Sequence, residues 1–386
     1  MASDATPFFD DAARRAARWL AEWDAQGVHR TATAGDAAGA DWLAREAAAQ
    51  GAAVSIEEFA LDRLDPVAAF LEIGTERIAA VPAFDAPSSD RAGVTGRLGP
   101  VGGDADIAVA ELSPRAVYSG EFARLRRLGN NRGFVIVCSG ESPGMGLLNA
   151  EQFREPYGVP TIHVASEAGA AVMEAAARGV PARLVAHSRR SQACGRNVVI
   201  ALDGTGGAEP PLVVMTPRSS WWQSTAERGG GIVCWLESLR AVLAIPTARP
   251  VIFTANSGHE LGHLGLDDFV ARRPGWEERA SWVHYGANIG AAGGALSLVS
   301  PDDDLRQLAA LELARAGQSH LTAPKTLVPS GETRDIHNKA GRYLTLVGTN
   351  PLFHLPQDRW PEAVEPGAVT RIAAAAARIV LALTCR

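Results

Sequence analysis

The stretch FTANSGHELGHLGLDDF, residues 253–269, places His259 and His263 four residues apart, with Glu260 directly after the first histidine. On a regular helix this spacing brings both imidazoles to one face, where they can bind zinc while the glutamate activates a bound water. Three glycines interrupt the stretch and disfavour a regular helix: Gly258, Gly262 and Gly265. The pattern alone therefore leaves two interpretations open, an independent H-E-x-x-H zinc protease or a helix N-terminus with two histidines near a polar surface.

Alternating strands and helices are predicted around this stretch. PVIFTAN (250–256) is a short apolar run typical of a buried strand, and LGLDDFVARR (264–273) has the spacing of a helix. Upstream, the candidate strands NVVIAL (197–202) and PLVVMT (211–216) precede the helical segment GGIVCWLESLRAVLA (230–244). The alternation predicts an α/β fold whose mixed, mostly parallel sheet is flanked by helices. Ligands gather at the carboxyl ends of the strands in such sheets, which is where the two histidines lie.

The first half of the chain shows other patterns. Helical spacing over residues 8–50 predicts two helices, followed by an alternating strand at 52–61. Residues 66–112 hold short strand-like runs separated by glycine, proline and aspartate, which predict an antiparallel or loop-rich region. Residues 133–187 predict a compact unit of strands and one Ala-rich helix. We therefore expect three parts, with boundaries at 1–94, 95–190 and 191–386.

Composition disfavours several classes of partner. The chain has 386 residues, 47% of them hydrophobic, which is enough for one large domain or two moderate ones. Its net charge of −6 is spread without long single-sign runs, so we expect neither nucleic acid nor a membrane as a partner. We also expect no secretory signal, and no apolar run close to the roughly 20 residues that span a bilayer.

The cysteines form no CxxC pair. Their wide spacing argues against a disulfide scaffold and against a cysteine-rich zinc site, so a reducing cytoplasm is the expected location. They are Cys138, Cys194, Cys234 and Cys385.

Five segments, in this order, resemble the catalytic core of the di-zinc aminopeptidase family, which includes bacterial zinc aminopeptidases, glutamate carboxypeptidases and glutaminyl cyclases. The segments are RNVVIALDGTGGAEPPLVVMTP (196–217), STAERGGGIVCWLESLR (224–240), VIFTANSGHELGHLGL (251–266), GETRDIHNKAGRYLTL (331–346) and FHLPQD (353–358). Residues of about 95–187 further resemble the smaller, β-rich protease-associated insert that some members carry. The resemblance implies an aminopeptidase-like fold with that insert.

The resemblance also implies a metal site, which this chain changes. The family binds two zinc ions with five ligands, and three of those positions match Glu227, Glu260 and His354. The two ligands private to the first metal fall on Pro217 and Ala287, which cannot bind a metal. Two carboxylates and one imidazole with an open fourth position can hold a divalent ion. The resemblance therefore implies one zinc ion where the family has two.

Histidine replaces the general base that the family places directly before its glutamate ligand. This residue is His259, which the resemblance makes a catalytic base or an added ligand, against a polar histidine lining an inactive cleft. His263 takes a position that is usually apolar, so we expect it to be packed or hydrogen-bonded and not a ligand. His284 and His337 are weaker candidates for replacement ligands, if the backbone directs them inward.

Other residues are expected beside the site. Arg218, Trp221 and Trp222 follow a strand end and either line a substrate pocket or pack beneath the insert. Asp358, four residues after His354, either orients that imidazole from outside the ligand set or caps a turn.

The sequence thus predicts a metal-dependent hydrolase of an amide or peptide-like bond in a small substrate. A cyclisation like that of the single-zinc glutaminyl cyclases in this family is also open. One alternative is a catalytically inactive, aminopeptidase-like binding protein, because fold does not guarantee function. The other is an independent H-E-x-x-H protease, with His259, His263 and a distal residue as ligands.

Overall fold

The structure is a computed structural model that describes residues 6–118, 120–206 and 210–384. Its α-helices are α1 Thr6–Asp24, α2 Ala34–Ala49, α3 Gly120–Leu128, α4 Gly169–Ala177, α5 Gly230–Leu243, α6 Leu264–Ala271, α7 Trp276–Arg279, α8 Asp303–Arg315, α9 Thr333–Asn338 and α10 Pro366–Thr384. Shorter turns of helix are η1 Pro114–Tyr118, η2 Ser166–Ala168, η3 Thr225–Gly229 and η4 His259–Leu261.

The strands form one continuous sheet that extends through both lobes of the protein. They are β1 Val54–Ile73, β2 Glu76–Pro82, β3 Val94–Pro100, β4 Ile107–Leu112, β5 Gly133–Cys138, β6 Thr161–Val164, β7 Pro181–Leu202, β8 Leu212–Pro217, β9 Val251–Asn256, β10 Ser281–Tyr285, β11 Leu296–Val299, β12 Leu321–Thr322 and β13 Arg342–Gly348.

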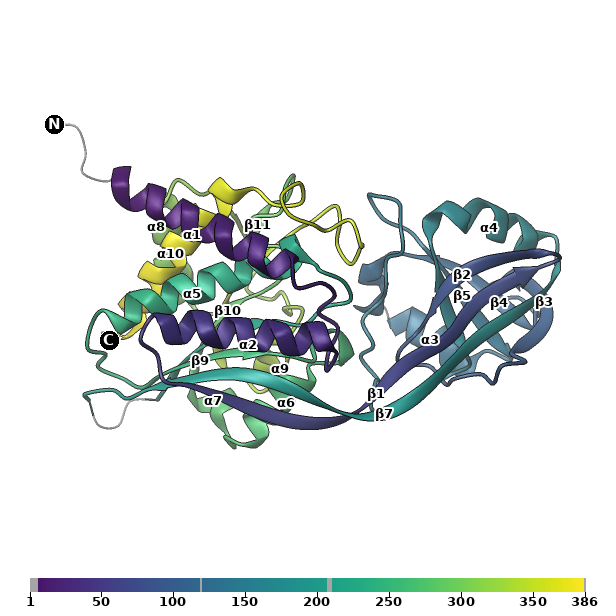
Figure 1. Ribbon diagram of the computed structural model, residues 1–386, viewed down its shortest axis with the longest axis horizontal. Coiled ribbons are helices and arrows are strands. Elements are labelled where there is room, and N and C mark those ends of the chain that lie inside the picture. The colour runs from purple at the N-terminus through teal and green to yellow at the C-terminus, as the bar shows by residue number, and fades with distance from the viewer. Residues whose placement is uncertain (1–5, 119, 207–209, 385–386) are drawn as a thin grey trace.

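The larger lobe is an α/β layer structure. Its sheet runs from β7 through β9, β8, β10, β13 and β11 to β12. The neighbours β9, β8, β10 and β13 are parallel, whereas β7 and β11 pair antiparallel at the two flanks. Helices α1, α2, α5, α8 and α10 cover one face, and α6, α7 and α9 cover the other (Figure 1). The predicted α/β class, with a large mixed sheet flanked by helices, is confirmed.

Alternation along the strands explains the two layers. Val214 and Phe253 contribute to the core beneath α5, whereas Val213 and Ile252, one residue earlier on each strand, contribute to the core beneath α6. Successive side chains of a strand point to opposite faces, so a strand that is apolar at every position must be covered on both sides. Residues 251–256 are buried throughout. This arrangement leaves the strand ends as the place where polar loops can gather.

The smaller lobe is a ring of strands built on a long ribbon. β1 and β7 pair antiparallel along almost their whole length, and their far ends leave the larger lobe (Figure 1). There β2, β6, β5, β4 and β3 close the ring between them. The neighbours from β3 to β6 are parallel, whereas β2 pairs antiparallel with β1 and β6, and β3 pairs antiparallel with β7. The prediction of an antiparallel or loop-rich region at 66–112 is therefore wrong for the β3–β4 pair. The three predicted parts, and the likeness of the smaller lobe to a protease-associated insert, stay predictions.

Helix α10 combines a length of 19 residues with an apolar composition. Of the described helices it is the one that is long and apolar enough to cross a membrane, so the expectation of no apolar run near that length is wrong here. However, 61% of its apolar window is buried inside the protein, where it packs against α1, α5 and α8. This is the packing of a core helix.

The two lobes meet through the segment at 147–151. Ala150 N donates a hydrogen bond of 2.8 Å to Glu260 O, and Leu147 O accepts one of 2.6 Å from His354 Nδ1. Glu151 forms an ion pair with Arg334 of the larger lobe. The smaller lobe thereby rests on the loops at the carboxyl ends of the sheet. Of the cysteines, Cys138, Cys194 and Cys234 are free thiols, and Cys385 lies outside the described residues.

Candidate metal centre

The loops that follow β8, β9 and β13 meet above the carboxyl ends of the sheet. β8 and β9 end in register, with Pro217 beside Asn256, so the segments after them start side by side. Parallel pairing of β10 against β8 brings His284 into the same layer, next to Met215. The sequence predicted a site at this edge of the sheet, and the loops after β8, β9 and β13 lie there.

The H-E-x-x-H stretch does not form a regular helix. Residues 259–261 make one 3-10 turn, with Gly258 at φ 87° before it and Gly262 at φ 82° after it. His263 itself has φ 63°, and α6 begins only at Leu264. The two imidazole rings nevertheless lie with centroids 5.3 Å apart. A turn with left-handed residues, and not the helical i, i+4 relation, therefore brings the two histidines together.

Glycine is required where this turn returns to the strand. A Cβ on Gly265 would lie 2.2 Å from Ser257 O, which is far inside the contact distance. The α6 backbone can therefore begin against the β9 loop only because this position has no side chain. The close approach keeps His259 and His263 on one short, rigid connection.

One group of three side chains in the described part of the chain could bind a metal ion. Single ligand atoms of His259, His263 and Glu332 all lie within 4.8 Å of one another, and all three residues are buried. His259 Nδ1 lies 2.8 Å from Glu332 Oε1, and His284 Nε2 lies 3.6 Å from Glu332 Oε2. His263 Nδ1 lies 2.6 Å from Asp335 Oδ2. Because Asp335 takes Nδ1, the Nε2 atom of His263 is left for a metal, in the arrangement common for zinc-binding histidines.

The charges of the group follow from burial and from its neighbours. Burial and the Arg228 guanidinium lower the pKa of His259 to about 4, although Glu332 opposes them. Burial disfavours charge on His263, but Asp335 and Glu332 outweigh it and raise the pKa of that ring to about 9. Burial likewise opposes ionisation of Glu332, yet His259 and His284 hold its pKa well below the ordinary value. At neutral pH the group therefore contains a neutral imidazole, a charged imidazole and a carboxylate.

Glu260 has different partners. Its Oε1 accepts hydrogen bonds from Thr31 N at 2.7 Å and Thr31 Oγ1 at 2.6 Å, and its Oε2 accepts one from Ser219 Oγ at 2.6 Å. Burial raises the pKa of this carboxyl, and the donors on Ser219 and Thr31 oppose the rise. Both oxygens are thus engaged by protein donors. The role of Glu260 as a metal ligand stays a prediction.

Glu227 and His354 come together as the sequence predicted for neighbouring ligands. His354 Nε2 lies 3.4 Å from Glu227 Oε1, and both residues are fully buried. The same oxygen lies 2.7 Å from Nη2 of Arg228, the next residue in the chain. Burial opposes ionisation of Glu227, but Arg228 and His354 lower its pKa to about 2. A guanidinium therefore already provides positive charge beside these two predicted ligands.

Asp358 supports the Glu227 backbone. It accepts hydrogen bonds from Ala226 N at 2.7 Å and Glu227 N at 3.0 Å, whereas His354 uses its Nδ1 on the smaller lobe. Burial raises the pKa of Asp358 to about 7, although the two amides oppose the rise. Its predicted alternative, the capping of a turn, agrees with these hydrogen bonds.

The other predicted residues are placed around the centre. Arg218 is buried against Asp36 at 2.8 Å, and Trp221 packs on Phe84 with centroids 4.6 Å apart. Trp222 Nε1 donates to His354 O at 2.9 Å. Of the candidate replacement ligands, His284 reaches Glu332, as described above. The other, His337, bonds to Tyr343 Oη at 3.0 Å, away from the group.

Two important residues were missed from the sequence. Glu332 lies at the start of the segment 331–346, to which the resemblance assigned no ligand, and its carboxylate reaches His259 because the start of α9 lies beside it. Arg228 follows a predicted ligand directly, and an arginine beside a carboxylate in a glycine-rich turn was the available signal. Buried atoms without a hydrogen-bond partner among the described residues surround this place: Arg228 Nη1, His284 Nε2, Glu332 Oε2 and His354 Nε2. Such atoms indicate that water, an ion or a small ligand belongs there.

Several residues around the candidate metal centre have strained backbone conformations. Positive φ angles occur at Ser224, His263, Asn288 and His354, which are not glycine. Each such conformation costs of order 1–3 kcal/mol and persists where surrounding contacts impose it, commonly at functional sites.

Comparisons with known proteins agree on the fold. A scan of family models finds no match, and no curated protein matches the sequence. The zinc aminopeptidase BSAP from Bacillus subtilis is 16% identical, with a TM-score of 0.77 over 97% of this chain and 95% of that one. An M28 peptidase precursor from Shewanella amazonensis SB2B is 13% identical, with a TM-score of 0.76 over 98% and 96%. The aminopeptidase from Aneurinibacillus sp. strain AM-1 is 14% identical, with a TM-score of 0.69 over 97% and 94%. The chain therefore shares the aminopeptidase-like fold over nearly its whole length.

Proposed function

We propose that this protein is a metal-dependent hydrolase of an amide or peptide-like bond in a small substrate, with one zinc ion held by His259, His263 and Glu332. The observation that carries the proposal is the group itself, three buried ligand side chains within 4.8 Å of one another at the carboxyl ends of a parallel sheet. Two imidazoles and one carboxylate with an open position make up a common catalytic zinc site. The shared fold with zinc aminopeptidases supports the same conclusion.

The residues present fit a metal. His259 is neutral because of its low pKa, as a ligand must be. His263 has the carboxylate partner that orients zinc-binding imidazoles, and its charged ring must release the Nε2 proton when the ion binds. Glu332 Oε2 has no hydrogen-bond partner among the described residues, so one ligand oxygen is not engaged. A bound zinc would polarise the substrate carbonyl and lower the pKa of a water molecule.

The chain's own residues supply the remaining chemistry. Arg228 is fully buried, and its Nη1 has no hydrogen-bond acceptor in the described part of the chain. A fixed guanidinium in such a place stabilises negative charge that develops on a substrate oxygen. His284 Nε2 lies 3.6 Å from Glu332 Oε2, too far for a hydrogen bond, so both atoms face the group without a protein partner among the described residues. In this arrangement His259 is a ligand, so it no longer serves as the base that the resemblance implies.

A second function is favoured by the Glu227–Arg228 pair. Arg228 Nη2 lies 2.7 Å from Glu227 Oε1 with both side chains fully buried, so an internal cation stands where the resemblance implies a metal. A protein that replaced its metal with arginine would keep the fold and bind a ligand or partner without catalysis. This is the inactive, aminopeptidase-like binding protein.

Metal analysis followed by a hydrolysis screen separates these functions. Protein purified without chelators is expected to contain one zinc per chain, to lose it in His263→Ala, and to keep it in His337→Ala, which removes a histidine that lies away from the group. Amino-acid anilides, dipeptides and N-acyl amino acids are then screened against native protein and Glu332→Gln. Hydrolysis that disappears with Glu332→Gln supports the hydrolase. Metal-free protein that is inert toward every compound supports the binding protein and overturns the proposal.

A further inference from the structure

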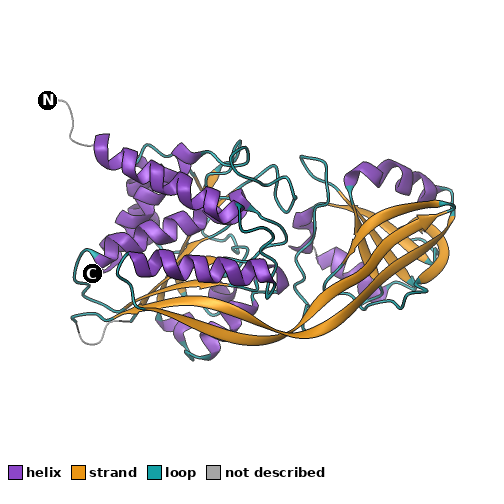
Figure 2. Ribbon diagram, in the orientation of Figure 1, coloured by secondary structure: helices purple, strands orange, loops and turns teal. Residues whose placement is uncertain are grey.

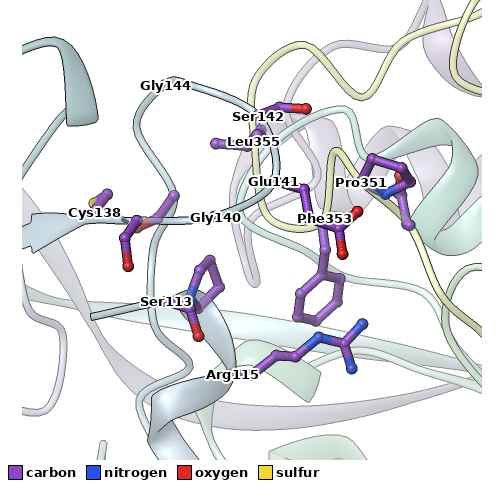
Figure 3. A pocket seen from close by; sticks show the side chains of 14 residues that line it. Ser113, Arg115, Cys138, Gly140, Glu141, Ser142, Gly144, Pro351, Phe353 and Leu355 are labelled. Atoms are coloured by element: carbon purple, nitrogen blue, oxygen red, sulfur yellow. Dashed lines mark hydrogen bonds between the residues drawn. The ribbon is translucent and has the colours of Figure 1, made fainter. Parts of the chain in front are cut away.

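A separate cavity lies where the two lobes face each other. It has a volume of about 250 Å³. Its walls come from the loops after β4 and β5 of the smaller lobe and from the loop at 350–355 of the larger lobe (Figure 3). The loops after parallel strands are the usual place for small ligands in α/β structures. His259, His263 and Glu332 are not among its lining residues, so it is distinct from the candidate metal centre.

Two opposite charges face this cavity without neutralising each other. Arg115 and Glu141 both line it and both are exposed. Among the residues that the structure describes, neither side chain has a hydrogen bond or ion pair. The Arg115 guanidinium lies 5.3 Å from the centre of the Phe353 ring, and the Glu141 carboxylate is drawn on the other side of that ring in Figure 3. A cation and an anion thus flank one aromatic surface.

We propose that this cavity binds a free α-amino acid with an apolar side chain. The ligand carboxylate pairs with Arg115, its ammonium group pairs with Glu141, and its side chain packs on Phe353, Leu355 and Pro114. A simple anion would meet the Glu141 carboxylate and a simple cation would meet Arg115, so the two charges together favour a zwitterion. The volume lies below the range of roughly 300–1,000 Å³ that drug-sized ligands occupy, which suits a single amino acid.

The cavity is connected by contacts to Glu227, which lies outside the proposed ligand set. The Phe353 ring stacks on the His354 ring with centroids 3.8 Å apart, and His354 faces Glu227. Asn350, which also lines the cavity, donates a 3.1 Å hydrogen bond to Asp358, the residue that holds the Glu227 amide. An amino acid in the cavity would therefore contact Phe353 and Asn350, and only one further residue, His354 or Asp358, would separate these from Glu227.

Calorimetric titration of the full-length protein tests this inference with three related probes. L-Leucine has both charges, N-acetyl-L-leucine lacks the ammonium group, and L-leucinamide lacks the carboxylate. We expect leucine to bind about tenfold or more tightly than either derivative, since each derivative loses one charge-assisted hydrogen bond. Equal affinity for the three probes, or no heat from leucine at millimolar concentration, overturns the inference.

Substitutions of exposed residues test whether leucine binds in this cavity. Arg115→Ala is expected to bind leucine and leucinamide equally weakly, and Glu141→Gln to bind leucine and N-acetyl-leucine equally weakly. Arg124→Ala and Glu121→Gln, which remove an exposed pair on α3, serve as matched controls and keep native selectivity. His263→Ala also keeps it, which separates this inference from the proposed metal centre. Leucine binding that survives in Arg115→Ala with its selectivity intact contradicts the inference.

Discussion

Glu227 and Arg228 are neighbours in the chain whose charges are removed from water together. Their side chains are fully buried, and Arg228 Nε also donates to Ser219 O at 2.7 Å. A buried ion pair gains little net stability over an apolar pair, but the loss of one partner leaves an unpaired charge in a low-dielectric interior. The pair is therefore sensitive to single changes.

A double-mutant cycle tests this pair. Glu227→Leu and Arg228→Met are each expected to lower the free energy of unfolding by about 3–5 kcal/mol, whereas the double variant recovers most of that loss. Urea unfolding of the four proteins measures the cycle. If the two single changes cost less than about 1 kcal/mol each and simply add, then the charges are solvated and the pair is not buried as described.

His163 is a titratable residue on β6 of the smaller lobe, outside the proposed ligand set. It is buried, and its Nε2 accepts a hydrogen bond of 3.4 Å from Leu148 N, which requires a neutral ring. Burial lowers its pKa from 6.5 to about 3. In the unfolded chain the ring takes up a proton below its ordinary pKa, whereas the folded chain excludes that proton.

Stability should therefore fall as the pH falls from about 6.5 toward 3. The unfolded state binds more protons in this window, so this histidine alone removes about 1.4 kcal/mol of unfolding free energy per pH unit. His163→Gln is expected to reduce the slope by that amount, and denaturant unfolding at several pH values from 6.5 to 4.5 measures it. An unchanged slope would show that the folded protein accepts the proton.

At the scale of elements, Glu260 joins three segments that are distant in the chain. Its carboxylate binds Thr31 in the connection between α1 and α2, and Ser219 after β8, while its backbone carbonyl binds Ala150. Ser219 Oγ also accepts hydrogen bonds from Gly258 N at 2.7 Å and His259 N at 3.1 Å. The residue therefore fixes the β9 loop that carries both histidines.

Glu260→Gln is expected to destabilise the protein by about 2 kcal/mol, because the new amide nitrogen faces a donor where an acceptor stood. Metal content should stay stoichiometric, since the three proposed ligands are unchanged. Thermal unfolding and elemental analysis of the same preparation measure the two effects. Loss of metal without loss of stability would show that Glu260 is a metal ligand, as the sequence predicted.

Sequence patterns predicted β8, β9, α5, α6 and the end of β7 in the larger lobe, because these strand segments are short apolar runs next to helices. The ribbon of β1 and β7 was not predictable in the same way. Asp65 and Pro66 interrupt its pattern, and the strand continues through them only because β7 pairs alongside, with a register shift after Pro66. Local pattern contains no information about such a partner.

The candidate site was predictable in part for a similar reason. His259 and His263 stand in one stretch, so their proximity follows from the chain itself. Glu332 lies far along the chain, and only the docking of α9 brings it to the histidines. The proposed ligands His259, His263 and the distal Glu332 therefore match the ligand set of the independent H-E-x-x-H alternative. In this protein a short turn carries the two histidines, whereas that motif places them on a helix.

At the scale of the whole molecule, the smaller lobe encloses the centre from one side. The segment at 147–151 reaches it through Leu147 O, Ala150 N and the Glu151–Arg334 ion pair. Residues of both lobes also share a buried apolar cluster in which Phe84 packs on Trp221, so loss of the Glu151–Arg334 ion pair opens the segment at 147–151 locally and leaves the lobes packed.

Glu151→Gln should favour that opening. Hydrogen exchange measured by mass spectrometry is expected to become faster at 147–151 and in the β9 loop, while β8 and β9 keep their protection. Glu174→Gln, which removes an exposed ion pair with Arg178 inside the smaller lobe, is the matched control and should change neither region. Uniformly faster exchange across both lobes would mean that Glu151 supports global stability instead.

Anomalous diffraction on either side of the zinc absorption edge tests the central claim most directly. Crystals of full-length protein purified without chelators are expected to show one strong zinc peak among His259, His263 and Glu332, and His263→Ala crystals are expected to show none. A peak beside Glu227 and His354, or no peak in the native protein, would contradict the proposed metal centre.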